Sequence, residues 1–157
     1  MVQLKRLTPL EALQKAKHFC SYQERCHAEV KEKLYSFGLY KNDVEKLLSD
    51  LIEEDYLNEE RFAIQFAGGR FRMKHWGKVK IKYELKQKRI SDYLIKKALK
   101  AIDETDYHKT LKQQAAKKWN TLTGTGMSKV VKTTAYLLQK GYEGGLISEV
   151  LKEIKAK

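Results

Sequence analysis

The stretch VKEKLYSFGL, residues 30–39, decides the fold because its apolar spacing recurs twice along the chain. The corresponding stretches are IKYELKQKRI at 81–90 and TTAYLLQKGY at 133–142. Apolar residues three to four positions apart are typical of one helix face, and self-similarity at a fixed interval indicates a repeat architecture. The three stretches begin 51 and 52 residues apart, so the sequence predicts three tandem units of about that length.

Each stretch ends at a position that favours glycine. Gly38 and Gly141 stand where a helix would end in a left-handed residue, a conformation that glycine adopts without steric cost. The middle unit has Arg89 at this position. Two alternatives follow there: Arg89 adopts the strained left-handed conformation, or this helix ends in a different way.

Each unit also has a helix before the repeated stretch and another after it. Thr8-Pro9-Leu10-Glu11 predicts the start of the first helix, because it combines a capping box with proline at the first helical position. Asn58 before two acidic residues predicts another start. Apolar residues in matching register predict the last helix of each unit, at 44–51, 95–102 and 147–154.

The expected fold is therefore all-α, with three tandem three-helix repeats in a right-handed or extended array. Short helices are unstable alone in water, so neighbouring helices and repeats must bury one another's apolar faces. We expect the first repeat at 1–57, the second, basic repeat at 58–104 and the third at 105–157.

Charge is distributed unevenly along the chain. The 157 residues hold 32 Lys+Arg against 20 Asp+Glu, a formal net charge of +12. Residues 41–60 hold two Lys against eight Asp+Glu, whereas residues 70–100 hold 12 Lys+Arg against only two acids. Such a basic block is the electrostatic footprint expected of a protein that faces phosphates or an acidic protein surface.

The candidate binding residues lie in this block. On a helix through 78–89, four cations at spacings of four, four and three would share one flank, although a lysine-rich face can also be only a solvated surface. Trp76 has two interpretations: a stacking platform that faces a partner, or a side chain that closes the core. We expect contact with the partner or nucleic acid from Arg70, Arg72, Lys74, Trp76, Lys78, Lys82, Lys86 and Arg89.

The sequence gives no indication of catalysis. It contains no glycine-rich phosphate loop and no dinucleotide fingerprint. His18, Cys20, Cys26 and His27 lack the paired short spacings of a zinc site, and two cysteines are too few for a disulfide framework. We therefore expect neither an enzyme nor a cofactor or metal requirement.

The sequence also favours a cytoplasmic protein. Its start has no apolar run long enough for a signal-peptide core, and no stretch approaches the roughly 20 apolar residues that span a bilayer. We expect a monomer with no membrane partner.

Three segments of the middle unit carry a pattern of charged, apolar and glycine positions: Asn58-Glu59-Glu60-Arg61-Phe62-Ala63, Lys74-His75-Trp76-Gly77-Lys78-Val79-Lys80-Ile81 and Glu84-Leu85-Lys86-Gln87-Lys88-Arg89-Ile90-Ser91. This pattern resembles the RecX family of recombinase regulators. Members of that family typically show an acid-acid-x-Arg-Phe-Ala start, a basic linker around a glycine, and Glu-Leu-x-x-Lys-Gly-Ile before the next helix. Arg89 replaces the usual glycine, and Trp76 stands where many relatives have a small residue.

The resemblance implies a modular helical protein that lies in the groove of the RecA recombinase filament on DNA. It also implies suppression of ATP hydrolysis, strand exchange and the coprotease activity of the SOS response, together with direct binding of single- and double-stranded DNA. The alternative is a stand-alone nucleic-acid-binding protein of the helix-turn-helix type, whose basic helix enters a major groove.

Overall fold

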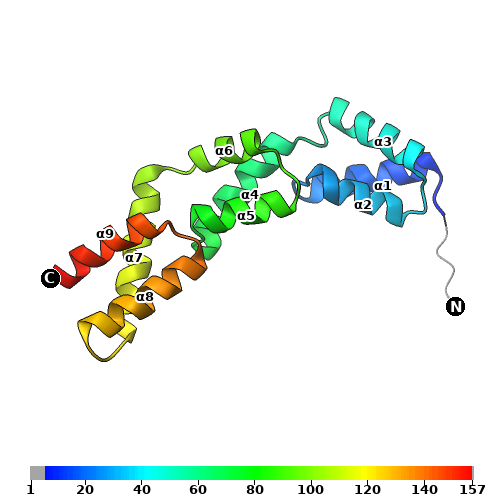
Figure 1. The fold of residues 1–157 in the computed structure, drawn as a ribbon. Coiled ribbons are helices and arrows are strands. Elements are labelled where there is room, and N and C mark those ends of the chain that lie inside the picture. Colours follow the sequence, from blue (N-terminus) through cyan, green and yellow to red (C-terminus); the bar gives the residue numbers. More distant parts are fainter. Residues whose placement is uncertain (1–5, 157) are drawn as a thin grey trace, which may run out of the picture.

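The chain folds into an elongated row of helices (Figure 1). The structure is a computed structural model that describes residues 6–156. These residues form nine α-helices and no strand, arranged as three groups of three, so the predicted all-α array of three-helix repeats is confirmed. The helices are α1 (Pro9–Tyr22), α2 (His27–Ser36), α3 (Lys41–Glu53), α4 (Glu59–Lys74), α5 (Lys78–Gln87), α6 (Asp92–Lys100), α7 (Glu104–Thr121), α8 (Gly126–Lys140) and α9 (Gly144–Ala156).

Helix ends follow the chemistry of the sequence. Thr8 caps α1 through the expected capping box, with Pro9 at the first helical position. Gly38 and Gly141 are left-handed, at φ +84° and +97°. Arg89 is also left-handed, at φ +61°, so the first of its two alternatives is correct. The Ile90 N–H donates to the Leu85 carbonyl at 3.1 Å and closes the helix end around this strained residue.

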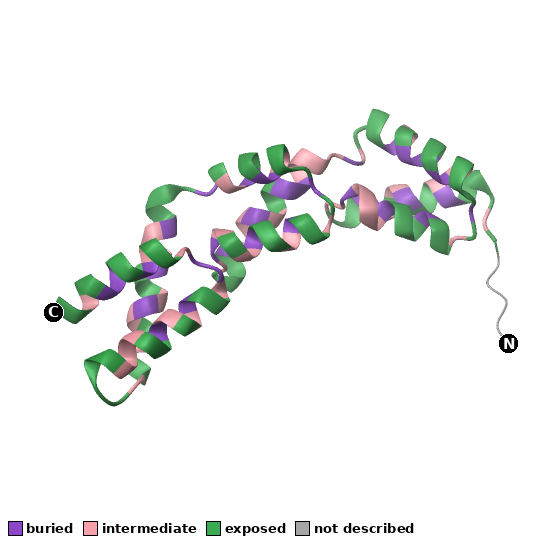
Figure 2. Cartoon of the chain, in the orientation of Figure 1, coloured by how far each residue is buried: buried purple, intermediate pink, exposed green. Residues whose placement is uncertain are grey.

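The buried residues form two cores (Figure 2). One core belongs to the first repeat and contains Leu34 and Leu39. The other is shared by the second and third repeats, with Leu85 and Leu137 among its residues. Cys26 of the first repeat also belongs to this shared core, whereas Cys20 lies in the first. Repeats two and three are therefore one packed body, to which repeat one adds a core of its own.

The junction between the second and third repeats depends on two backbones that approach closely. The Gly77 N–H donates to the Lys140 carbonyl at 2.8 Å, and the Val79 N–H donates to the Gly141 carbonyl at 2.9 Å. A Cβ added at Gly77 would overlap the backbone of Gly141 and Tyr142. Glycine is required at position 77 because a neighbouring repeat occupies the space of a side chain.

Two buried tyrosines complete this junction. The Tyr107 hydroxyl of α7 accepts from the Lys78 N–H at 2.9 Å and donates to the Glu143 carboxylate. The Tyr142 hydroxyl donates to the His75 carbonyl at 2.7 Å. Burial, which disfavours the charged phenolate, raises the pKa of both tyrosines. Both hydroxyls therefore stay protonated and act as donors.

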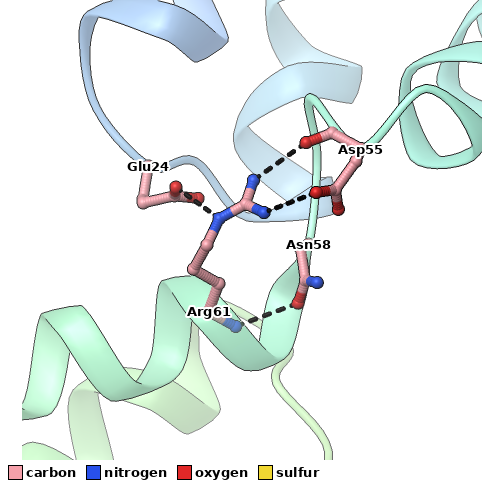
Figure 3. Close-up of polar contacts among 4 residues, drawn as sticks. All are labelled: Glu24, Asp55, Asn58 and Arg61. Atoms are coloured by element: carbon pink, nitrogen blue, oxygen red, sulfur yellow. Dashed lines mark hydrogen bonds and ion pairs between the residues drawn. The ribbon is translucent and has the colours of Figure 1, made fainter.

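The junction between the first and second repeats is more polar. The Arg61 guanidinium on α4 reaches the Glu24 carboxylate at 2.5 Å, the Asp55 carboxylate at 3.2 Å and the Asp55 carbonyl at 3.0 Å (Figure 3). In addition, the His27 N–H donates to the Glu59 carboxylate at 3.0 Å. One arginine thus connects the α1–α2 turn, the end of α3 and the start of α4.

The two ends of the array differ. At the first repeat, the Leu7 N–H donates to the Phe37 carbonyl at 3.0 Å. Phe37 stands in the register of Lys140, so this bond repeats the bond that Gly77 makes at the internal junction. At the third repeat, the corresponding surface at the start of α8 leaves Met127 and Val131 exposed. A preceding segment of the chain therefore contacts the end of α2 at one end of the array, and Met127 and Val131 are exposed at the other.

Candidate partner-binding surface

The basic residues singled out by the sequence lie on two helices and the turns that follow them. Arg70, Arg72 and Lys74 occupy the last turns of α4, and Trp76 lies in the turn to α5. Among the cations of this stretch, Arg72, Lys74, Lys82, Lys86 and Arg89 are exposed. Lys86 lies 3.9 Å from the Asp92 carboxylate, a weak contact for two exposed groups. Five of the seven candidate cations are therefore accessible, and Lys96, Lys97 and Lys100 on α6 add three more exposed cations to the second repeat.

Lys78 lies apart from the exposed cations. Its ammonium group is 2.6 Å from the Glu104 carboxylate at the start of α7 and 4.7 Å from the centre of the Tyr107 ring on the same helix. Only 19% of its side chain is exposed. The hydrogen bond from Lys78 lowers the pKa of Glu104, so this carboxylate is charged over a wider pH range. The geometry makes Lys78 part of the junction between repeats.

Trp76 lies partly in the core and partly among cations of the basic block. Its half-buried side chain packs against the shared core, so the core interpretation holds for part of the ring. Three cations also surround the ring, at 4.5 Å for Lys80, 5.5 Å for Lys74 and 5.6 Å for Arg70. Arg70 is half-buried and lies 4.5 Å from the Phe66 ring as well. This cluster of Phe66, Arg70, Trp76 and nearby lysines is a cation–aromatic surface.

A second cation–aromatic surface lies in the first repeat, where sequence reasoning placed none. An open groove of about 580 Å³ runs between α1 and α2. The sequence places Phe19 only on the apolar face of a helix. Arg25 follows six residues later, and this spacing alone does not predict that the two side chains meet. The groove is lined by Gln14, Lys15, His18, Phe19, Tyr22, Arg25, Lys33 and Phe37.

Metal and membrane features are absent from the described residues. No group of three or more His, Cys, Asp or Glu side chains within 6–156 is placed to hold a metal ion. No helix in that range is long and apolar enough to cross a membrane. His18 and Cys20 lie on α1, Cys26 follows as the cap of α2, and both cysteines are buried free thiols.

Fold and surface together define a tandem helical-repeat protein with cationic and aromatic residues on its surface. Family models described as the second and third three-helix domains of RecX match residues 58–99 and 104–151. The chain is 30% identical to the regulatory protein RecX of Clostridium acetobutylicum over 150 residues, which cover 92% of this chain and 69% of that protein. The chain belongs to the RecX family.

Further similarities agree with this assignment. The regulatory protein RecX of Salmonella typhimurium is 29% identical over 140 residues, 83% of each chain. The crystal structure of RecX from Lactobacillus salivarius superposes with a TM-score of 0.87 at 23% identity, over 95% of this chain and 97% of that one. At this identity the structural likeness concerns the fold.

Proposed function

We propose that this protein binds the RecA–DNA filament and inhibits the recombinase, in its ATP hydrolysis, its strand exchange and its coprotease activity in the SOS response. Family membership supports a regulatory role. The observation that carries the proposal is the basic block at 70–100, because eight of its twelve cations are exposed on one repeat of an elongated molecule. An elongated array contacts a filament over a long surface, and cations on it attract phosphates or acidic side chains.

Lys82 and Lys86 on α5, with Arg72, Lys74 and Arg89 nearby in sequence, are the contacts we assign to the filament and to DNA. Lys78 is left out of the test because its replacement would break the ion pair with Glu104. The double variant Lys82→Glu, Lys86→Glu changes two exposed positions of one helix face. We expect it to lose most inhibition of DNA-dependent ATP hydrolysis by RecA, with helicity unchanged.

The matched control is Lys117→Glu, Lys132→Glu, which changes the charge equally at two exposed positions of the third repeat. Wild-type inhibition by the Lys82, Lys86 variant would contradict the proposal. The alternative, a stand-alone nucleic-acid-binding protein, predicts equal affinity for bare duplex and for a RecA filament whose DNA is saturated. Preference for the filament supports the regulator.

A further inference from the structure

We propose that the groove between α1 and α2 of the first repeat binds unstacked bases of single-stranded nucleic acid. This site goes beyond the basic block of the second repeat and rests on the proposed function only in taking DNA as the ligand. The two helices lie side by side (Figure 1). The groove is lined by residues of both helices and of the turns that follow them. The proposal rests on the charge of the groove, on its aromatic rings and on its continuity with the Trp76 cluster.

The groove gathers positive charge in a repeat that is nearly neutral. Residues 1–57 hold nine Lys+Arg against ten Asp+Glu, a balance of −1. Nevertheless, the eight described residues that line the groove include Lys15, Arg25 and Lys33 and no Asp or Glu. Cations gathered in one hollow repel one another unless an anion neutralises them. The groove is therefore suited to an anionic ligand.

The aromatic residues of the groove add flat stacking surfaces. Tyr22 is 78% exposed, and Phe19 and Phe37 are half-buried around the same hollow. The Arg25 guanidinium lies 3.7 Å from the centre of the Phe19 ring, and its Nε donates to the Phe19 carbonyl at 3.0 Å. The guanidinium is thus held in place over the ring, and bases stack on guanidinium planes as well as on aromatic rings.

The second repeat also has one aromatic residue and one cation at the two corresponding positions. Counted from Leu34 and Leu85, Phe19 and Arg25 correspond to Arg70 and Trp76, with the cation and the aromatic residue exchanged. In both repeats the pair lies close together, at 3.7 Å and 5.6 Å. A surface that recurs in consecutive repeats fits a ligand that is itself repetitive.

A series of contacts links the two surfaces across the junction between the first and second repeats. Lys33 lies 5.3 Å from the Phe19 ring and 5.7 Å from the Phe37 ring. One turn earlier on α2, the Glu29 carboxylate lies 3.8 Å from the Lys88 ammonium group. Lys88 in turn lies 5.7 Å from the Phe66 ring, next to Arg70 and Trp76. Glu29 is the one acid on this path, and Lys88 offsets its charge.

A single strand of nucleic acid fits this surface better than an acidic protein segment does. An acidic protein segment would bind through one apolar anchor flanked by carboxylates, and one groove is enough for such a segment. It would not need the second cation–aromatic surface. Bases and phosphates alternate along a strand and match an alternation of aromatic and cationic side chains over two repeats. We therefore infer that the ligand of the groove is nucleic acid, and the experiment below distinguishes it from an acidic peptide.

The test compares two double variants of the full chain. The first, Lys15→Glu, Tyr22→Ala, changes exposed residues that line the groove. The second, Lys46→Glu, Tyr35→Ala, makes the same changes at exposed positions of the same repeat outside the groove. Affinity for a fluorescein-labelled oligothymidylate, measured by anisotropy without RecA, should fall about 10-fold in the first variant and less than about twofold in the second.

An abasic strand of the same length isolates the contribution of the bases. Wild type should prefer oligothymidylate to this strand, and the groove variant should lose most of that preference. Equal affinities of the two double variants for oligothymidylate would overturn the proposal. So would a groove variant that retains wild-type affinity for the oligonucleotide but no longer binds an acidic, phenylalanine-containing peptide.

The two proposals are tested by different measurements. Binding of the oligonucleotide by the groove variant tests the groove, and inhibition of RecA by the Lys82, Lys86 variant tests the proposed function. A groove that binds no strand would leave that inhibition and its dependence on the second repeat intact.

Discussion

At the scale of the residue, Thr133 is the clearest departure from the pattern of the repeats. It stands in the register of Val30 and Ile81, which are fully buried, and it is fully buried itself. Within the described part of the chain its hydroxyl has no hydrogen-bond partner. A buried hydroxyl without a partner costs free energy because it has given up its bonds to water.

Replacement of Thr133 by valine should therefore stabilise the protein. Valine has nearly the same shape and brings no polar group into the core, so we expect the free energy of unfolding to rise by about 1 kcal/mol. Denaturant unfolding followed by circular dichroism would measure it. Thr134→Val at the neighbouring, half-exposed position is the control and should change stability by less than about 0.5 kcal/mol. A destabilised Thr133→Val variant would contradict the statement that the Thr133 hydroxyl lacks a hydrogen-bond partner.

Arg89 shows how function and stability compete at one residue. A left-handed arginine costs about 1 kcal/mol or more relative to glycine, and the two sister positions do hold glycine. In return, the chain gains one more exposed cation next to Lys82 and Lys86 on the second repeat. The strain is thus located in the repeat to which we assign partner binding, where such costs are commonly found.

At the scale of the element, the start of α5 in the second repeat is held against the end of α8 in the third repeat by a close approach that tolerates no side chain. Gly77→Ala would drive a Cβ into the backbone of Gly141 and Tyr142. Backbone atoms cannot move aside like the end of a flexible side chain, so the junction must open.

We expect Gly77→Ala to lower the free energy of unfolding by about 2 kcal/mol or more. Gly69→Ala is the matched control, because a Cβ at this position in the middle of α4 meets no atom within 4 Å. Alanine is the better helix former, so that variant should be more stable by about 0.5–1 kcal/mol. Thermal unfolding of both variants measures the change in Tm. Equal changes of Tm in the same direction would show that the backbone at the junction moves to make room for the added Cβ.

Much of this architecture could be predicted because it depends on local rules. The cap at Thr8 and the left-handed ends at Gly38 and Gly141 follow from residue type and spacing. The role of Lys78 could not be predicted, because its partners Tyr107 and Glu104 lie more than 25 residues away in sequence. The groove of the first repeat could not be predicted for the same reason. Its lining depends on how α1 and α2 pack together, which the periodicity of either helix does not show.

At the scale of the whole molecule, the two junctions differ in how they are held. The second and third repeats share a core, whereas Arg61 connects the first and second repeats mainly through polar contacts. Cys26 reports on this polar junction, because it belongs to the first repeat but is buried in the shared core. Burial raises the pKa of its thiol to about 11, so the group is protonated as well as shielded at neutral pH.

Arg61→Gln should therefore speed the alkylation of Cys26 by iodoacetamide about fivefold or more, since a loss of about 1 kcal/mol at the junction raises its open population by that factor. Cys20, which lies in the core of the first repeat, should react at the wild-type rate. Mass spectrometry of Cys20→Ser and Cys26→Ser backgrounds separates the two sites, with Arg72→Gln as the control. Equal acceleration of both cysteines would instead mean that Arg61 supports the first repeat itself.

The array also has a direction, which follows from its unequal ends. The start of α5 docks on the end of α8, the Leu7 N–H makes the matching bond at the end of α2, and Met127 and Val131 are exposed at the start of α8. A strand of nucleic acid has a direction too, from 5′ to 3′. Two directional polymers can lie side by side in a parallel or an antiparallel sense, and these senses are not equal in energy. If the groove of the first repeat binds a strand as we propose, the array would favour one of the two senses over the other.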